Sequence, residues 1–102
     1  MRKKAKEYNV SAQTMLAVIE CESKFRIDVQ SNHRYTPTNV PPGYEVGDRE
    51  QSFGLVQVHL PAHPTITKEQ ATNPEFAVEF LANNLQQNRG NMWTCYNQVA
   101  MR

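Results

Sequence analysis

The sequence predicts a mainly α-helical domain with an irregular central lobe and at most a small β-hairpin. Apolar residues recur at three- and four-residue spacing over 12–23 and again over 76–85, as on the buried face of a helix. Between these segments, prolines and glycines interrupt residues 25–51 and exclude a long helix. Since 102 residues can bury one hydrophobic core, we expect a single domain over residues 1–102.

The composition is that of a folded domain without a strong charge bias. Apolar residues make up 39% of the chain, charged residues 21%, and the formal net charge is +1. Proteins that neutralise nucleic-acid phosphates are usually more basic or carry a stripe of Lys and Arg. The basic cluster formed by Arg2–Lys4 and Lys6 is at the terminus and is more typical of a solvated helix start. We therefore expect no nucleic-acid partner.

We expect neither a membrane span nor a complete signal peptide in this chain. No apolar stretch approaches the roughly 18 residues of a membrane-spanning helix. The basic start resembles the first part of a signal peptide, but Glu7, Asn9, Ser11 and Gln13 interrupt the apolar core that should follow. Two interpretations stay open: the protein is not exported by this route, or the chain is a domain of a longer exported protein.

The N-terminal third predicts two helices. A short one over 2–8 has Ala5 and Tyr8 as its contacts with the core. Ser11 is a suitable N-cap for a second helix from Ala12 to Ser23. The core face of that helix carries Met15, Val18 and Ile19, with Ala12 and Leu16 alongside, and Glu22 lies at its C-terminal edge.

The second apolar run, Ser52–Val58, contains Gly54 and Gln57. A glycine within such a run suggests the close approach of another backbone or a ligand. A buried glutamine needs partners for its amide, which a polar substrate could supply. The alternative is a short core strand whose glutamine faces solvent. We expect a small hairpin between Tyr44 and Val58.

The remaining elements follow from capping signals. Thr67 and Gln70 have the spacing of a capping box, and Asn73-Pro74-Glu75 is typical of a helix start. We expect that helix to end at Gly90. A last helix, packing on the first two, is predicted from its apolar residues Met92, Trp93, Tyr96, Val99 and Ala100. The expected total is three or four helices.

The cysteines and histidines leave little support for a metal site. Cys21 and Cys95 are the only cysteines; they either form a bridge between the two ends of the domain or remain two buried thiols. His59 and His63 have the spacing of helical metal ligands, but Pro61 lies between them and no third ligand is evident. We expect no metal and no cofactor.

Glu22 is the candidate for acid–base chemistry. A glutamate at a helix end is usually a surface residue, but this one shares a face with Met15 and Ile19. Burial raises the pKa of a carboxyl group, and a glutamic acid that stays protonated near neutral pH can act as a general acid. Glu20 points to a different face, so the two cannot form a carboxylate pair on one helix.

Three blocks, in this order, resemble the lysozyme-like lytic transglycosylase family, which includes the soluble lytic transglycosylase catalytic domain and goose-type lysozymes. Ile19-x-x-Glu22-Ser23-x-Phe25 is similar to the family's Glu-Ser signature at a helix end. Gly54-Leu55-Val56-Gln57-Val58 is similar to its Gly-Leu-Met-Gln block, and Cys95-Tyr96-Asn97 to its Ala-Tyr-Asn block. The resemblance covers about residues 8–97.

The resemblance implies cleavage of the β-1,4 bond between N-acetylmuramic acid and N-acetylglucosamine in peptidoglycan, without metal or cofactor. It implies that Glu22 is the catalytic acid and base, with Ser23 beside it in the groove. The sugar subsites would be lined by Gly54, Leu55, Val56 and Gln57. Tyr96 would hydrogen-bond near the glutamate, and Asn97 completes the matching block. The implied location is the periplasm, the cell wall or outside the cell, with a phage-associated origin open.

The resemblance leaves two products open. A lone Glu22 could form a 1,6-anhydro end, as lytic transglycosylases do, whereas hydrolysis by two carboxylates needs a second acid across the groove. Gly47-Asp48-Arg49 resembles a goose-type stretch in which an Asp helps to position water, so Asp48 is a possible second acid. A further goose-type acid is replaced here by His59, and Glu50 is an alternative without a predicted place.

Departures from the family pattern also keep a second class of function open. Val56 replaces the usual Met, and Gln98 follows Tyr96-Asn97 where a small residue is common. The chain stops soon after, and its central lobe is longer than in compact members. A non-catalytic peptidoglycan-binding or structural module is therefore an alternative, although such a module could easily have lost Glu22. We expect glycan strands as the partner and a monomer.

Overall fold

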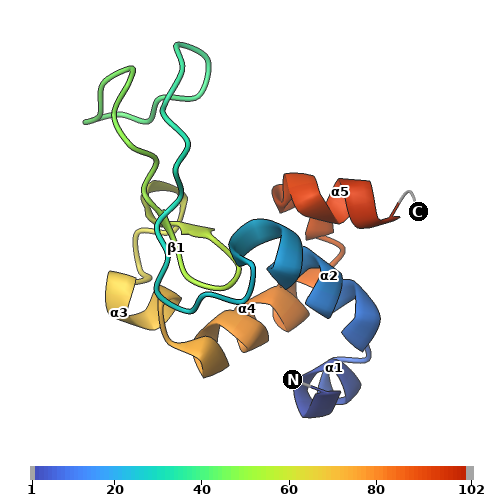
Figure 1. Cartoon of the computed structure of the whole chain (residues 1–102). Coiled ribbons are helices and arrows are strands. Elements are labelled where there is room, and N and C mark those ends of the chain that lie inside the picture. The colour runs from blue at the N-terminus through green and yellow to red at the C-terminus, as the bar shows by residue number, and fades with distance from the viewer. Residues whose placement is uncertain (1, 101–102) are drawn as a thin grey trace.

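The computed structural model describes residues 2–100, without the side chains of residues 94, 99 and 100. Within them the chain forms five α-helices, two 3-10 turns and one antiparallel hairpin (Figure 1). The helices are α1 (Arg2–Glu7), α2 (Ala12–Ser23), α3 (Lys68–Ala71), α4 (Pro74–Gln86) and α5 (Thr94–Ala100); the strands are β1 (Ser52–Phe53) and β2 (Val58–His59); the 3-10 turns are η1 (Leu60–Ala62) and η2 (Gly90–Met92). The mainly helical class is confirmed. There are five α-helices rather than the three or four expected, and two of them, α1 and α3, are short.

Helix α2 has the bounds that its sequence predicts. The Ser11 hydroxyl accepts a hydrogen bond from the amide of Thr14, which caps the helix start. The helix ends at Ser23, and the C-cap residue Lys24 has a left-handed backbone with φ 53°. Met15, Val18 and Ile19 are fully buried. The next-to-last residue of α2, Glu22, is thereby fixed on a rigid and well-packed element.

The N-termini of α3 and α4 also follow the sequence, but the end of α4 does not. Thr67 forms the expected capping box with Gln70, and the Asn73 side chain caps α4. The predicted end at Gly90 is wrong, because the helix stops at Gln86 and the chain turns at Asn88 with φ 60°.

Gly90 instead begins the turn η2. A β-carbon there would collide with the ring of Tyr96, so the glycine serves close packing rather than helix termination.

The core forms where α2, α4 and the hairpin meet. Its largest fully buried side chains are Met15, Val18, Ile19, Val56, Val58 and Leu81. Ala5 of α1 is buried and Tyr8 packs against the core, as expected. Within residues 2–100, no helix is both long and apolar enough to cross a membrane.

The hairpin is shorter than the sequence suggests. Ser52 pairs with His59 and Phe53 with Val58, so the apolar run is two short strands joined by a turn at 54–57 rather than one strand. Neither strand extends back toward Tyr44. The turn uses two left-handed residues, Gly54 with φ 84° and Gln57 with φ 51°.

The central lobe includes a projecting arm, which we define as residues 32–49 (Figure 1). Its two limbs are joined where the Tyr35 amide donates to the Asp48 carbonyl and the Gly47 amide to the Tyr35 carbonyl, both at 2.9 Å. An isolated bridge between Arg34 and Arg49 continues this pairing. The arm is therefore an ordered ribbon, and its base lies against the hairpin.

A disulfide bond joins Cys21 of α2 to Cys95 of α5, with an S–S distance of 2.04 Å and a Cα–Cα distance of 5.9 Å. Of the two possibilities left open by the sequence, the bridge is the one that forms. It closes a separation of 74 residues. As a consequence, the start of α5 is held against the end of α2, directly beside Glu22.

Candidate active site

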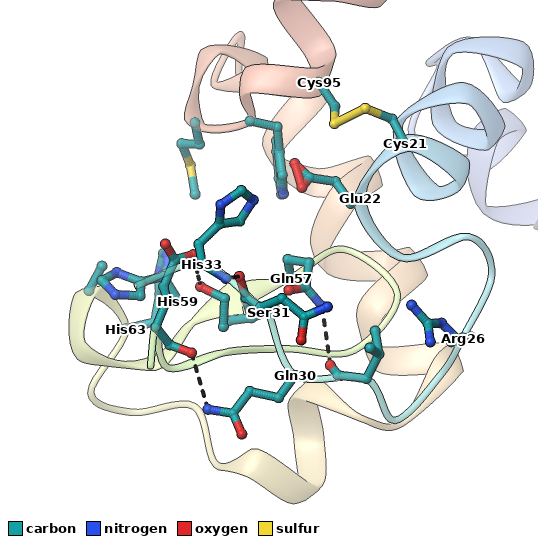
Figure 2. Close-up of a pocket in the computed structure, with 18 of the residues that line it drawn as sticks. Cys21, Glu22, Arg26, Gln30, Ser31, His33, Gln57, His59, His63 and Cys95 are labelled. Atoms are coloured by element: carbon teal, nitrogen blue, oxygen red, sulfur yellow. Dashed lines mark hydrogen bonds between the residues drawn. A yellow bond between two sulfur atoms is a disulfide. The ribbon is translucent and has the colours of Figure 1, made fainter. Parts of the chain in front are cut away.

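A cavity of about 990 Å³ opens between the end of α2, the base of the arm, the hairpin and the start of α5 (Figure 2). This volume is at the upper end of the range for small-ligand sites. Each of the four parts contributes chemically distinct groups. They are Glu22 from α2, Ser31 and His33 near the arm base, Gln57 and His59 from the hairpin region, and Trp93 before α5.

Glu22 lies at this cavity, next to the disulfide (Figure 2). Its side chain is half-buried, and both ion pairs among the described side chains involve Lys4 rather than Glu22. Burial raises the pKa of Glu22 from 4.5 to about 7, and the nearby negative charge of Glu50 adds to the effect. Near neutral pH a substantial share of the molecules therefore carries a protonated Glu22, as a general acid requires.

Glu50 is a second carboxylate on the same cavity. Its amide donates to the His33 carbonyl at 2.8 Å, and its carbonyl accepts from the Gln30 side chain at 3.1 Å. The hydroxyl of the buried Ser52 donates to its Oε1 at 2.8 Å. Both the backbone and the side chain of Glu50 are thus fixed.

Asp48 is placed differently. Its Oδ2 accepts from the Glu45 amide at 2.9 Å, which closes a turn on the arm. Asp48 does not belong to the cavity lining, whereas Glu50 does. The role of Asp48 as second acid stays a prediction, and the carboxylate that shares the cavity with Glu22 is the one for which the sequence predicted no place.

Gln57 lines the cavity, as the resemblance implied for a subsite residue. Its side-chain amide donates to the carbonyl of Val29 at 3.2 Å, drawn as a dashed line from Gln57 in Figure 2, and to that of Gly54 at 2.9 Å. These bonds occupy both amide hydrogens inside the protein and tie the turn to the loop after α2. The amide oxygen keeps its capacity to accept a hydrogen bond from a ligand.

The other predicted site residues near Glu22 and in the turn lie behind the cavity rather than on its surface. Ser23 is buried, and its hydroxyl donates to the Ile19 carbonyl at 3.0 Å. Gly54, Leu55 and Val56 are also buried. None of these four belongs to the cavity lining. These four buried residues pack beneath Glu22 and Gln57, which line the cavity.

Tyr96 and Asn97 likewise do not line the cavity. The Tyr96 ring is half-buried and covers Gly90, whereas Asn97 is exposed. Contact with the cavity from this part of the chain comes instead from Met92, Trp93, Cys95 and Gln98. Trp93 is buried, and its indole N–H donates to the Val56 carbonyl at 2.7 Å.

An aromatic and histidine wall completes the cavity, and sequence reasoning did not assign it to the site. It comprises Tyr35, His59, His63, Phe80 and Trp93. The Tyr35 hydroxyl accepts a hydrogen bond from the Gln51 amide at 3.0 Å and shares another with Nε2 of His59 at 2.9 Å.

His63 packs edge-on against Phe80, with ring centroids 5.2 Å apart. Burial, together with the neighbouring His59, lowers the pKa of His63 and favours its neutral form. In the sequence, the four-residue spacing of His59 and His63 is the available signal for this wall, but that spacing is typical of metal ligands. Among the described residues, no group of three or more His, Cys, Asp or Glu side chains could hold a metal ion.

A mainly helical domain with a proton-retaining glutamate at a helix end, facing an open cleft, has the arrangement of a lysozyme-like enzyme. The family model "Transglycosylase SLT domain" matches residues 1–100, and the chain belongs to this family. Membership implies peptidoglycan as substrate and lytic transglycosylase activity in general terms, and the family acts in the periplasm or cell wall. Searches of curated proteins and of solved structures returned no match.

Proposed function

We propose that this protein cleaves the β-1,4 bond between N-acetylmuramic acid and N-acetylglucosamine, as a lytic transglycosylase that forms 1,6-anhydromuramic ends. The observation that carries the proposal is the environment of Glu22. It is a half-buried carboxyl group with a pKa of about 7, at an open cavity, in a chain of the transglycosylase family. We also propose that residues 1–102 form a single domain of this kind, of which the resemblance covers about residues 8–97.

In the first step Glu22 acts as an acid. Its proton passes to the glycosidic oxygen as the C1–O4 bond breaks, and positive charge develops on the muramic ring. The pKa of Glu22 makes this donation possible near neutral pH, because an ordinary glutamate would already be ionised.

In the second step the ionised Glu22 acts as a base. It takes the proton of the muramic 6-hydroxyl while that oxygen bonds to C1, which closes the 1,6-anhydro ring. One carboxyl group thus returns to its starting state, with no water, metal or cofactor consumed.

The cavity suits a polar and bulky sugar substrate. Ser31 and Gln57 offer hydrogen-bonding groups, while Phe80 and the exposed Met92 offer apolar surface to a sugar. The arm borders the same cavity through Tyr35 and lengthens the surface along which a glycan strand could lie. We therefore assign the arm to substrate binding.

Hydrolysis, as in a goose-type muramidase, is the second candidate, and Glu50 is the observation that favours it. Two carboxylates on one cavity are the minimum that a two-carboxylate glycoside hydrolase needs. A non-catalytic peptidoglycan-binding module is a weaker candidate, because it gives no reason for Glu22 to hold a proton at neutral pH.

The products of peptidoglycan digestion test the proposal. Purified sacculi are incubated with the protein, and the released muropeptides are analysed by mass. Anhydro ends, which lack one water relative to reducing ends, are expected as the main product. Only reducing ends would point to the muramidase, and intact sacculi would leave the binding module.

A further inference from the structure

Glu50 is the other carboxylate at the cavity, and the transglycosylase mechanism leaves it without a role. Lytic transglycosylation uses one carboxyl group twice, so a second carboxylate beside Glu22 is not required. Bringing two like charges to one cavity is unfavourable unless one of them is neutralised or well solvated. The fold nevertheless holds Glu50 there by its backbone and by its side chain.

The hydrogen bond from Ser52 fixes the orientation of Glu50. Ser52 is 2% exposed, and it lies on β1, the strand that also receives the Ser31 amide. Its hydroxyl bonds to Oε1 at 2.8 Å. A carboxylate has two oxygens, so the second one can accept a hydrogen bond from a water molecule in the cavity.

We propose that Glu50 is a second functional carboxylate of this site, which positions and deprotonates a water molecule so that a share of turnovers ends in hydrolysis. The inference rests on the proposed function, since it uses the same bond cleavage by Glu22. It adds that the protein forms two kinds of product, one with anhydro ends and one with reducing ends. The Glu50–Ser52 pair then determines the hydrolytic share.

The hydrolytic branch begins after Glu22 has given its proton to the leaving oxygen. A water oxygen bonds to C1 of the muramic ring in place of the 6-hydroxyl, and one of its protons passes to Glu50. The product carries a reducing end with a C1 hydroxyl. Glu50 then loses its proton to solvent and Glu22 regains one, so that one water molecule is consumed for each bond broken.

A second consequence concerns the pH dependence of both branches. The titratable and charged groups that line the cavity around Glu22 are Lys24, Arg26, His33, Tyr35, Glu50, His59 and His63. Of these, Glu50 is the one whose charge contributes to the raised pKa of Glu22. Its removal should lower that pKa and move the loss of activity on the basic side to lower pH.

The test compares Glu50→Gln, Ser52→Ala and the wild-type chain on purified sacculi. In Glu50→Gln we expect the ratio of reducing to anhydro ends to fall at least 10-fold, because a lost general base costs about 10²–10⁴ in rate. Ser52→Ala keeps the charge but loosens its orientation, so the ratio should fall less and the basic limb of the pH profile should stay in place. Glu20→Gln, at an exposed glutamate outside the cavity lining, is the matched control and should leave the ratio unchanged. Asp48→Asn tests the other candidate for the second acid.

Three results would overturn the inference. They are a wild-type digest with anhydro ends alone, a Glu50→Gln digest with the wild-type ratio, or a loss of reducing ends in Asp48→Asn instead. In each of these the proposed cleavage by Glu22 still stands. Intact sacculi, or a wild-type digest with reducing ends alone, contradict the proposed function itself, so the two failures are distinguishable. Unfolding curves for each variant separate loss of fold from loss of the hydrolytic branch.

Discussion

Replacing Glu22 by Gln should stabilise the folded protein at pH 8 and change its stability little at pH 4. The physical reason is the raised pKa of Glu22, from 4.5 to about 7. Between these two values the folded protein still holds a proton that the unfolded chain has released. The free energy of unfolding therefore falls as the pH rises through this window and is level above it. Glutamine does not titrate, so the free energy of unfolding of the variant does not fall in this way.

The size of the effect follows from the shift. The difference between 7 and 4.5 is 2.5 units, and at about 1.4 kcal/mol for each unit the upper limit is about 3.5 kcal/mol. Glu22 keeps substantial contact with solvent, which screens its charge, so we expect a gain of about 1–2 kcal/mol at pH 8. For a domain of this size, that gain corresponds to a rise in Tm of roughly 4–15 °C.

Urea unfolding followed by Trp93 fluorescence, at pH 4 and at pH 8, measures the effect. Glu20→Gln is the control, because Glu20 is an exposed glutamate on the same helix. We expect its stability to follow the wild-type chain at both pH values. The reasoning is refuted if Glu22→Gln is no more stable than the wild-type chain at pH 8, or if it gains equally at pH 4.

Two further predictions concern the supports of the cavity. Replacing Cys21 and Cys95 by Ala removes a disulfide between residues 74 apart in the sequence and should lower the free energy of unfolding by about 2–5 kcal/mol. Urea unfolding without reductant measures this loss, and an unchanged midpoint would mean that the disulfide adds no stability. Gly54→Ala should prevent folding, because its β-carbon would overlap the Ala71 carbonyl oxygen. The control Gly43→Ala has a similar positive φ but lies in open space, so it should cost only about 1 kcal/mol of stability. Equal effects of the two variants on Tm would contradict this packing argument.

Local signals in the sequence predicted much of the helical frame. Ser11 caps α2 and Asn73 caps α4 because capping depends on residues three apart, which a single sequence displays. The end of α4 was missed for a related reason. A glycine such as Gly90 can end a helix or admit a neighbouring ring, and only the distant Tyr96 decides between these uses.

The candidate site was predicted less completely because its parts meet over long sequence distances. The placement of Glu22 followed from the apolar face of its own helix. By contrast, Glu50 reaches the cavity through bonds to Gln30 and His33, and the pattern around it contains no trace of that pairing. The family resemblance points instead to Asp48, two residues earlier in the sequence. That difference matters, because Glu50 lines the cavity and Asp48 does not.

The most direct test of the central claim is the rate at which Glu22→Gln releases fragments from purified sacculi near pH 6. At this pH the carboxyl group of Glu22 should be mostly protonated in the wild-type chain. Loss of the general acid should lower the rate about 10²–10⁴-fold, while the variant stays folded and Glu20→Gln keeps the wild-type rate. A folded Glu22→Gln that cleaves peptidoglycan at the wild-type rate would contradict the claim.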